Sequence, residues 1–236
     1  MKKRGERIGV FGGTFDPFHN GHLDVALVAA DALALDRVLL VPALTPPHRV
    51  VPPQASAWHR FAMTALAADT DPRLAPSDIE LRSGATSYTA ATLDRLREAV
   101  PLPSQFFFIT GADAFAEIET WRDYPALLDR CTFVAVSRPN HPASALREGI
   151  PQLRARMVLV GSDTNVDAAP VLQGSGAVGF PVFLIDARTS DVSGTELRRR
   201  LAAGESISGL VPPAIARHIQ KIGLYAPAQA GGRPVA

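Results

Sequence analysis

The chain has 236 residues, of which 47% are hydrophobic and 20% are charged, and its formal net charge is +1 at pH 7. This length is enough to bury a core without disulfides or metal ions. The near-neutral charge argues against a broad nucleic-acid footprint, and no apolar run approaches the ~20 residues that a membrane-spanning helix needs. The basic N-terminus lacks the apolar region of a signal peptide, and a single cysteine allows no internal disulfide. We therefore expect a cytoplasmic protein.

Residues 7–22, RIGVFGGTFDPFHNGH, form the most informative stretch of the chain. A β-branched and aromatic run ends in Gly12 and Gly13, and an apolar pattern with a period of about 3.6 residues begins shortly afterwards, which predicts a strand, a tight loop and a helix. Glycines can take positive φ and let a ligand approach the backbone N–H groups, while the helix start attracts anions. His19 lies just before this helix and His22 in its first turn, so both rings can face one anion.

This stretch has two other interpretations. The first is a glycine-rich turn with a capping Asp16 and two surface histidines. The second is a metal site of Asp16, His19 and His22, but one helical turn offers too few ligands and Cys131 offers no thiolate partner. The glycine pair, the Asp-Pro step and His-x-Gly-His agree in order and spacing with the helical run. We therefore favour a phosphate site without a protein-bound metal.

A βαβ unit is predicted for the first part of the chain. The helix, residues 21–35, has four residues on its apolar face: Leu23, Leu27, Ala30 and Leu33. The apolar residues 37–41 follow as a parallel strand that is buried on both faces. Residues 42–53 contain five prolines and are expected to form an extended loop. This loop leaves the strand at the carboxyl edge of the sheet, where open α/β sheets bind their ligands.

Helices and strands continue to alternate along the rest of the chain. Helices are predicted at residues 56–68 with Ser56 as N-cap, at 91–100, in a short segment ending at Trp121, from an N-cap at Ser193 with Glu196 three residues later, and at 213–222. Strands are predicted at residues 79–81, 105–110, 131–137, 157–160 and 182–186. Residues 161–179 are expected to form a surface loop, and residues 226–236 a disordered tail.

This order of elements predicts the fold class and the domain organisation. We expect an α/β protein with a doubly wound, mostly parallel sheet and a small C-terminal helical part. Neither an internal repeat nor a linker divides the chain, so residues 1–225 are expected to form a single domain.

Five motifs carry a resemblance to a known family. They are GGTFDP with HNGH at residues 12–22, PPHR at 46–49, SYT at 87–89, GAD at 111–113 followed by Trp121, and SGTELR at 193–198. The first motif alone indicates the nucleotidyltransferase superfamily, whereas the ordered set resembles the bacterial nicotinate mononucleotide adenylyltransferases. The match runs from about residue 7 to Tyr225. Gly194, where the family more often has Ser or Ala, and the loop at residues 161–179 depart from the family pattern.

The resemblance implies a fold, a reaction and its partners. The fold would be the Rossmann-like nucleotidyltransferase fold. The reaction would be adenylyl transfer from ATP to nicotinate mononucleotide, giving deamido-NAD and pyrophosphate in NAD biosynthesis. Mg²⁺ would arrive with the ATP phosphates, no nucleic acid or membrane would take part, and a homo-oligomer is left open. Because the attacking phosphate is already largely dianionic, no general base is needed, and catalysis reduces to positioning and charge neutralisation.

The resemblance also implies site residues by position. Those implied in catalysis are His19, His22 and Arg198. Those implied in binding ATP and its phosphates are Gly12, Gly13, Thr14, Phe15, Ser193 and Thr195. Those implied in binding the nicotinate nucleotide are Thr89, Gly111, Asp113, Trp121 and Arg122.

Considered without the resemblance, several of these residues keep plainer interpretations. Trp121 is equally a core aromatic, Asp113 is equally a helix cap, and the basic run at residues 198–200 is typical of a solvated helix face. Two rival functions also stand. Another transferase of the same fold, such as phosphopantetheine adenylyltransferase, would not need Trp121 together with the SYT motif. A nucleotide sensor without turnover would not need His19, His22 and Arg198.

Overall fold

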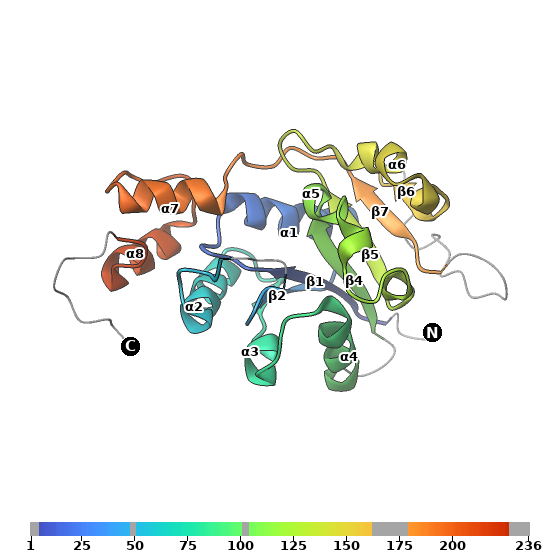
Figure 1. The fold of residues 1–236 in the computed structure, drawn as a ribbon, viewed down its shortest axis with the longest axis horizontal. Coiled ribbons are helices and arrows are strands. Elements are labelled where there is room, and N and C mark those ends of the chain that lie inside the picture. The colour runs from blue at the N-terminus through green and yellow to red at the C-terminus, as the bar shows by residue number, and fades with distance from the viewer. Residues whose placement is uncertain (1–4, 48–50, 101–103, 162–178, 227–236) are drawn as a thin grey trace.

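The computed structural model describes residues 5–47, 51–100, 104–161 and 179–226. Within these residues the strands form one parallel sheet in the order β3-β2-β1-β4-β5-β7-β6 (Figure 1). The strands are β1 (Arg7–Gly13), β2 (Arg37–Pro42), β3 (Leu74–Pro76), β4 (Gln105–Gly111), β5 (Thr132–Val136), β6 (Met157–Leu159) and β7 (Val182–Ile185). The order runs in opposite directions on either side of the β1–β4 pair, which confirms the predicted doubly wound parallel sheet.

Helices cover both faces of this sheet. The α-helices are α1 (Asn20–Ala32), α2 (Ala57–Ala68), α3 (Ile79–Ser83), α4 (Thr89–Ala99), α5 (Ala112–Phe115), α6 (Leu146–Gly149), α7 (Gly194–Ala202) and α8 (Pro213–Ile222). The 3₁₀ helices are η1 (Ile118–Thr120), η2 (Ala126–Asp129), η3 (Ala143–Ala145) and η4 (Pro151–Arg156). Figure 1 shows α1 on one face and α3 and α4 on the other. Among the described residues, no helix is long and apolar enough to cross a membrane.

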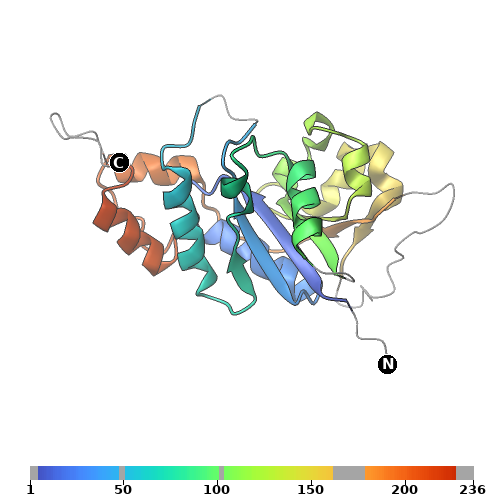
Figure 2. The ribbon, with the colours of Figure 1, turned by 90° about the horizontal axis from the view of Figure 1, so that it is seen from below.

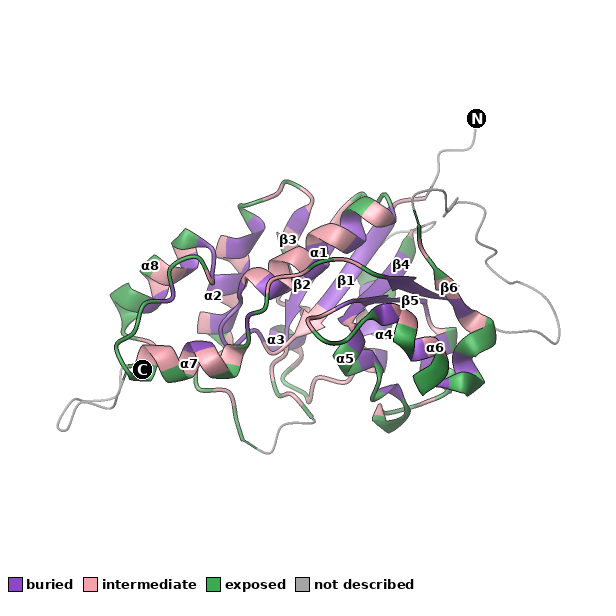
Figure 3. Ribbon diagram, turned by 90° about the horizontal axis from the view of Figure 1, so that it is seen from above, coloured by how far each residue is buried: buried purple, intermediate pink, exposed green. Residues whose placement is uncertain are grey.

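The two faces of the sheet bury two separate apolar clusters. Side chains alternate along each strand, so that Phe11 packs with α1 whereas Val10 packs with α4. Figure 3 shows the strands almost wholly buried and the outer sides of the helices exposed. The sheet is therefore a fixed support for the loops at its carboxyl edge.

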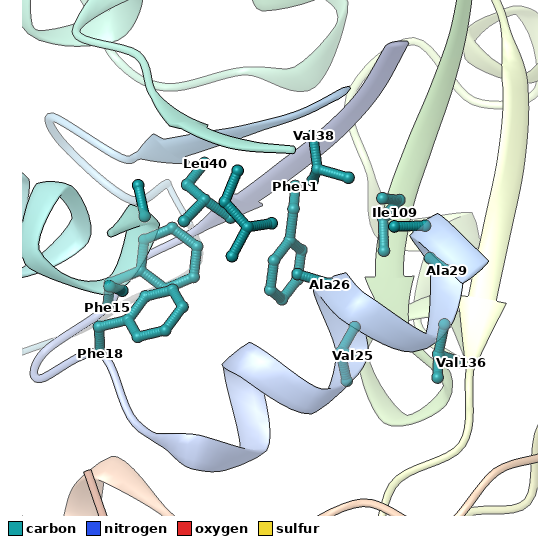
Figure 4. Packing of buried hydrophobic residues seen from close by; sticks show 14 of the residues in the cluster. Phe11, Phe15, Phe18, Val25, Ala26, Ala29, Val38, Leu40, Ile109 and Val136 are labelled. Atoms are coloured by element: carbon teal, nitrogen blue, oxygen red, sulfur yellow. The ribbon is translucent and has the colours of Figure 1, made fainter. Parts of the chain in front are cut away.

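The face of α1 that packs on the sheet differs in part from the prediction. Its buried residues are Gly21, Val25, Ala26, Ala29 and Ala30. Figure 4 shows Ala26 beside Phe11, with the helix lying close to the strands. Leu23 and Leu27, which were predicted to lie on the buried face, are only partly buried at its border. Small side chains occupy the closest contact because they allow the helix backbone to approach the sheet.

The strand predicted at residues 79–81 is wrong. This segment is the short helix α3, which ends at Gly84 in the left-handed conformation with φ 63°. The strand of this region is β3, which lies at the sheet edge, pairs with β2 and ends at Pro76. Proline is tolerated at such an edge position, although it weakened the strand signal in the sequence.

The helix starts predicted from capping residues are confirmed. The Ser56 hydroxyl accepts the His59 backbone N–H at 3.3 Å at the start of α2, and the Ser193 hydroxyl accepts the Glu196 N–H at 3.2 Å at the start of α7. Helices α7 and α8 form the predicted C-terminal helical part and lie at one end of the molecule, where α8 packs against α2 (Figure 2). Most of the predicted loop at 161–179 and of the tail at 226–236 lies outside the described residues.

Gly9 in the central strand offers a test of core packing. A Cβ atom there would lie 2.8 Å from Ile109 Cδ1 and 2.9 Å from Leu35 Cδ1. We expect Gly9→Ala to lower the free energy of unfolding by about 1–3 kcal/mol, because the neighbouring side chains must leave their favoured rotamers. Urea denaturation measures this loss. Gly149→Ala is the control, since nothing lies within 4 Å of its new Cβ, and equal stability of the two variants would contradict the packing described.

Candidate active site

The loop that follows β1 begins with the predicted glycine pair. Gly13 pairs with Pro42, and its carbonyl accepts the Ala43 N–H at 2.8 Å, so the loop after β2 starts beside it. The positive φ expected at the glycines occurs at neither; Phe15 adopts it instead, with φ 52°. A Cβ at Gly13 would lie 2.5 Å from Phe15 Cε1. The glycine is thus required by the close approach of the phenylalanine ring.

Phe15 itself is part of the core. Its ring is buried and packs edge-on against Phe11 at 5.5 Å between centroids, and it also contacts Phe18 at 5.1 Å (Figure 4). Phe15 was predicted to bind the nucleotide, but because its ring is buried only its backbone can face a ligand. The Thr14 backbone carbonyl, one residue earlier, accepts a hydrogen bond from Arg60 at 2.8 Å.

The Asp16 carboxylate joins the loop after β1 to two distant parts of the chain. Its Oδ2 accepts the Gln54 N–H at 2.9 Å, and its Oδ1 accepts the Ala55 N–H at 3.1 Å and the Tyr225 hydroxyl at 2.7 Å. Burial and the neighbouring Asp16 charge raise the pKa of Tyr225, which therefore stays protonated as a donor. Asp16 does not cap α1, so the simple capping interpretation is wrong.

Arg198 completes this junction from α7. Its Nη1 donates to the Asp16 backbone carbonyl at 2.5 Å, and its Nη2 donates to Thr195 Oγ1 at 3.2 Å. The Arg198 side chain is only 15% exposed, whereas Arg200 forms an exposed pair with Glu196. A Cβ at Gly194 would lie 3.1 Å from the Asp16 carbonyl, which gives a steric reason for glycine at this position.

The two motif histidines form a stacked pair at the start of α1. His19 is the N-cap and His22 the third helical residue, and their ring centroids are 3.6 Å apart with an interplanar angle of 22°. The His19 backbone N–H donates to His22 Nδ1 at 3.3 Å. His19 is 2% exposed, so it is not the surface histidine of the plainer interpretation.

Both rings are held in the neutral form. Burial, together with the charge of Arg138, lowers the pKa of His19 to about 3. Burial, His19 and Arg138 also lower the pKa of His22. A neutral imidazole carries one N–H donor, so the pair offers directed hydrogen bonds toward an anion while adding no positive charge of its own.

Arg138 is a site residue that the sequence reasoning missed. It lies two residues after the end of β5, its Nη2 donates to the Val192 carbonyl at 3.3 Å, and its Nη1 lies 2.9 Å from where a Cβ on Gly21 would be. The only local signal is its position: a basic residue just past the end of a buried strand reaches the same carboxyl edge as the glycine pair. The residues that Arg138 contacts come from distant segments, so no regular spacing in the sequence marks it as a site residue.

A cavity of about 330 Å³ brings five of the predicted residues together: Gly12, Gly13, Thr14, Thr89 and Trp121. Trp121 is half-buried and packs edge-on against Phe108, with 6.0 Å between ring centroids, so it is both a packing aromatic and a cavity wall. Arg122 lines a smaller cavity that shares Thr89 and Trp121, and its guanidinium lies 4.5 Å from the Tyr88 ring centroid.

The remaining predicted residues lie outside this cavity. Gly111 ends β4 and is the N-cap of α5, and Asp113 is exposed as the second residue of that helix, so the helix-cap interpretation of Asp113 is wrong. The histidine pair with Arg138 forms a second group, and Arg198 with Ser193 and Thr195 forms a third around Asp16. The structure therefore divides most of the predicted residues into three groups along the carboxyl edge of the sheet, whereas Phe15, Gly111 and Asp113 belong to none of them.

Two sets of hydrogen bonds hold the loops around the cavity. The Arg60 guanidinium, 1% exposed as a residue, donates to the carbonyls of Thr14 at 2.8 Å, Leu44 at 3.2 Å and Ala55 at 3.3 Å. Ser87 Oγ accepts the Leu44 N–H at 2.9 Å. The loops after β1 and β2 and the segment before α4 are thereby fixed to one another.

The comparisons with known proteins agree with this architecture. A family model described as cytidylyltransferase-like matches residues 10–200, and together with the fold it defines a cytidylyltransferase-like protein. The probable nicotinate-nucleotide adenylyltransferase of Citrifermentans bemidjiense is 36% identical over 223 residues, covering 94% of this chain and 100% of the relative. That of a Thermus thermophilus strain is 40% identical over 219 residues, covering 93% and 99%. The chain belongs to the nicotinate-nucleotide adenylyltransferase family, as the motifs predicted.

A solved structure supports the fold. The Plasmodium falciparum nicotinic acid mononucleotide adenylyltransferase complexed with NaAD matches with a TM-score of 0.68 at 17% identity, covering 93% of this chain and 97% of that one. At this level of identity the likeness concerns the fold alone.

The neutral histidine pair predicts a pH dependence of stability. Unfolding returns His19 to its ordinary pKa near 6.5 from about 3, so the unfolded chain binds the extra proton and stability falls as the pH drops below about 6.5. At pH 5 this single group costs about 2 kcal/mol relative to pH 7. His19→Asn should reduce the loss in urea unfolding, while His141→Asn, at an exposed position, should not. Identical pH dependence of all three proteins would contradict the buried neutral state.

Proposed function

We propose that the chain transfers the adenylyl group of ATP to nicotinate mononucleotide, giving deamido-NAD and pyrophosphate in NAD biosynthesis. The observation that carries the proposal is the near-full-length identity of 36% and 40% to probable nicotinate-nucleotide adenylyltransferases. It is supported by the position of the residue 12–22 motif, which lies where the strand order reverses.

The chemistry asks for positioning and charge stabilisation. An oxygen of the mononucleotide phosphate forms a bond to the α-phosphorus of ATP, the bond from that phosphorus to the bridging oxygen breaks, and pyrophosphate leaves with the electron pair. The nucleophile is already deprotonated, so the site needs no general base. Donors that stabilise charge developing in the transition state therefore supply the catalysis.

In this proposal the histidine pair faces the α-phosphate. His19 and His22 stand at the N-terminus of α1, whose free N–H groups and dipole favour the same anion. Arg138 adds positive charge beside the pair. Arg198, with Ser193 and Thr195 at the start of α7, would hold the β- and γ-phosphates.

The divalent metal of this reaction is proposed to be Mg²⁺ bound to the ATP phosphates, where it neutralises their charge. Among the described residues no group of three or more His, Cys, Asp or Glu side chains could hold a metal ion. Both Asp16 carboxylate oxygens already accept hydrogen bonds. These oxygens are therefore already engaged, which supports a metal that is held mainly by the nucleotide.

The cavity of about 330 Å³ is proposed to take the nicotinate end of the mononucleotide. Its pyridinium ring would stack on Trp121, whose indole face favours a positive charge. Its carboxylate would accept the N–H groups at the start of α4 and the Thr89 hydroxyl. Gly111, Asp113 and Arg122 would border the ribose and the ring.

Further expectations from the sequence stay predictions. They are a single domain over residues 1–225, a cytoplasmic location, no nucleic-acid or membrane partner, and a homo-oligomer as an open option.

The proposed function is tested by the choice of acceptor. An amide would turn its NH₂ against one carboxylate-binding donor and leave that donor unpaired, which costs ~1–3 kcal/mol, or roughly ten- to a hundredfold in kcat/KM. In a pyrophosphate-release assay we expect kcat/KM for nicotinate mononucleotide to exceed that for nicotinamide mononucleotide by about tenfold or more. Trp121→Ala should weaken both substrates alike and leave their ratio unchanged.

The other outcomes of this assay identify the rivals. Turnover with phosphopantetheine instead of either mononucleotide would indicate the related transferase. ATP binding without pyrophosphate release from any acceptor would indicate a sensor.

Arg198 and Arg200 provide a matched pair for the triphosphate assignment. Both are arginines of α7, but Arg198 contacts the Asp16 loop, whereas Arg200 pairs with Glu196 at the surface. We expect Arg198→Ala to lower kcat/KM for ATP by about a hundredfold, the scale of one lost charge-assisted donor, and Arg200→Ala to change it little. Steady-state kinetics with varied ATP measures both, and equal effects would point to a general surface field.

A further inference from the structure

Glu80 is a buried carboxylate to which the proposed chemistry gives no role. The residue lies in α3 and is 6% exposed. The Thr92 hydroxyl of α4 donates to its Oε1 at 2.6 Å, while its Oε2, also buried, has no hydrogen-bond partner in the described part of the chain. A buried carboxylate oxygen without a donor is costly and therefore calls for an explanation.

Glu80 forms part of the wall of the cavity that also contains Thr89 and Trp121. The other described residues of this wall are apolar, glycine or hydroxyl-bearing, so Glu80 is the one charged side chain among them. In surroundings of low polarity a charge acts strongly over several ångströms, because little solvent screens it. The cavity therefore presents a negative potential to whatever enters it.

The chemistry of the proposed substrate fits this potential. The ring nitrogen of a nicotinate mononucleotide carries a permanent positive charge. The ring carboxylate, by contrast, is repelled by Glu80 and would turn toward the N–H groups at the start of α4. The single buried charge of Glu80 would thus stabilise the bound pyridinium ring and also orient its carboxylate.

We propose that Glu80 is a specificity-determining residue that selects a cationic pyridinium ring over an uncharged ring of the same shape. This inference rests on the proposed function, because it concerns the same cavity. It differs from the stacking on Trp121, which any flat ring would share in large part.

The experiment compares two acceptors that differ only in ring charge. They are nicotinate mononucleotide and its C-nucleotide isostere, in which a neutral 3-carboxyphenyl ring replaces the pyridinium. We expect the wild type to prefer the charged ring, and Glu80→Gln to reduce this preference in kcat/KM by about tenfold or more. The glutamine side chain keeps an oxygen that can accept the Thr92 hydroxyl, so α3 and α4 remain joined by this hydrogen bond.

Controls separate charge from structure. Glu98→Gln makes the same chemical change on the exposed side of α4 and should leave the preference at its wild-type value. Glu80→Met, neutral and of similar volume, serves as a second neutral variant if Glu80→Gln does not fold, as judged by circular dichroism.

The outcomes distinguish this inference from the proposed function. A neutral variant that lowers kcat/KM equally for both acceptors would reveal a structural role and overturn the inference. A wild type that adenylylates neither acceptor would overturn the proposed function itself.

Discussion

The hydrogen-bonded Asp16 carboxylate is the constraint on which the arrangement of the site depends. A buried carboxylate costs free energy unless its oxygens accept hydrogen bonds. Here the donors come from Gln54 and Ala55 before α2 and from Tyr225 after α8, while Arg198 binds the carbonyl of the same residue. All of these segments must be in place together. The C-terminal helices, although they lie at one end of the molecule, are therefore fixed relative to the loop after β1.

Arg60 supplies the complementary contact on the other side of this loop. Its buried guanidinium binds the carbonyl of Thr14 in the loop after β1 and the carbonyls of Leu44 and Ala55 at the two ends of the connection from β2 to α2. Asp16 uses backbone N–H groups and Arg60 uses backbone carbonyls, so both charges serve to align main chain. The site edge is thus rigid because two buried ions of opposite sign hold its loops.

The sequence was sufficient for those features that local patterns determine. The strands other than β3 and the caps of α2 and α7 follow from hydrophobic runs and from serine at helix starts, which act within a few residues. The segment 79–81 failed because three residues of alternating polarity fit a strand and a single helical turn equally well. The choice depends on Gly84 and on the contact of Glu80 with Thr92, twelve residues away.

Two further misses have different physical causes. The prediction for α1 placed leucines on the buried face because they are more hydrophobic than alanines. The helix lies so close to the sheet, however, that the small side chains of Ala26 and Ala29 occupy the contact. Arg138 escaped notice because its neighbours, the histidine pair and Val192, come from other segments. Long-range placement by the sheet decides such residues, and no spacing in the sequence encodes it.

The charges of the site are arranged by sign along the sheet edge. Arg138 stands beside the neutral histidines and Arg198 beside Asp16, so positive charge collects where the phosphates are proposed to bind. The cavity beyond Gly13 carries Glu80 in its wall instead. A mononucleotide has its negative phosphate at one end and its positive ring at the other. Only one of its two directions along this edge matches both ends, so the same charges that would bind the substrate would also set its direction, with the phosphate toward the histidine pair.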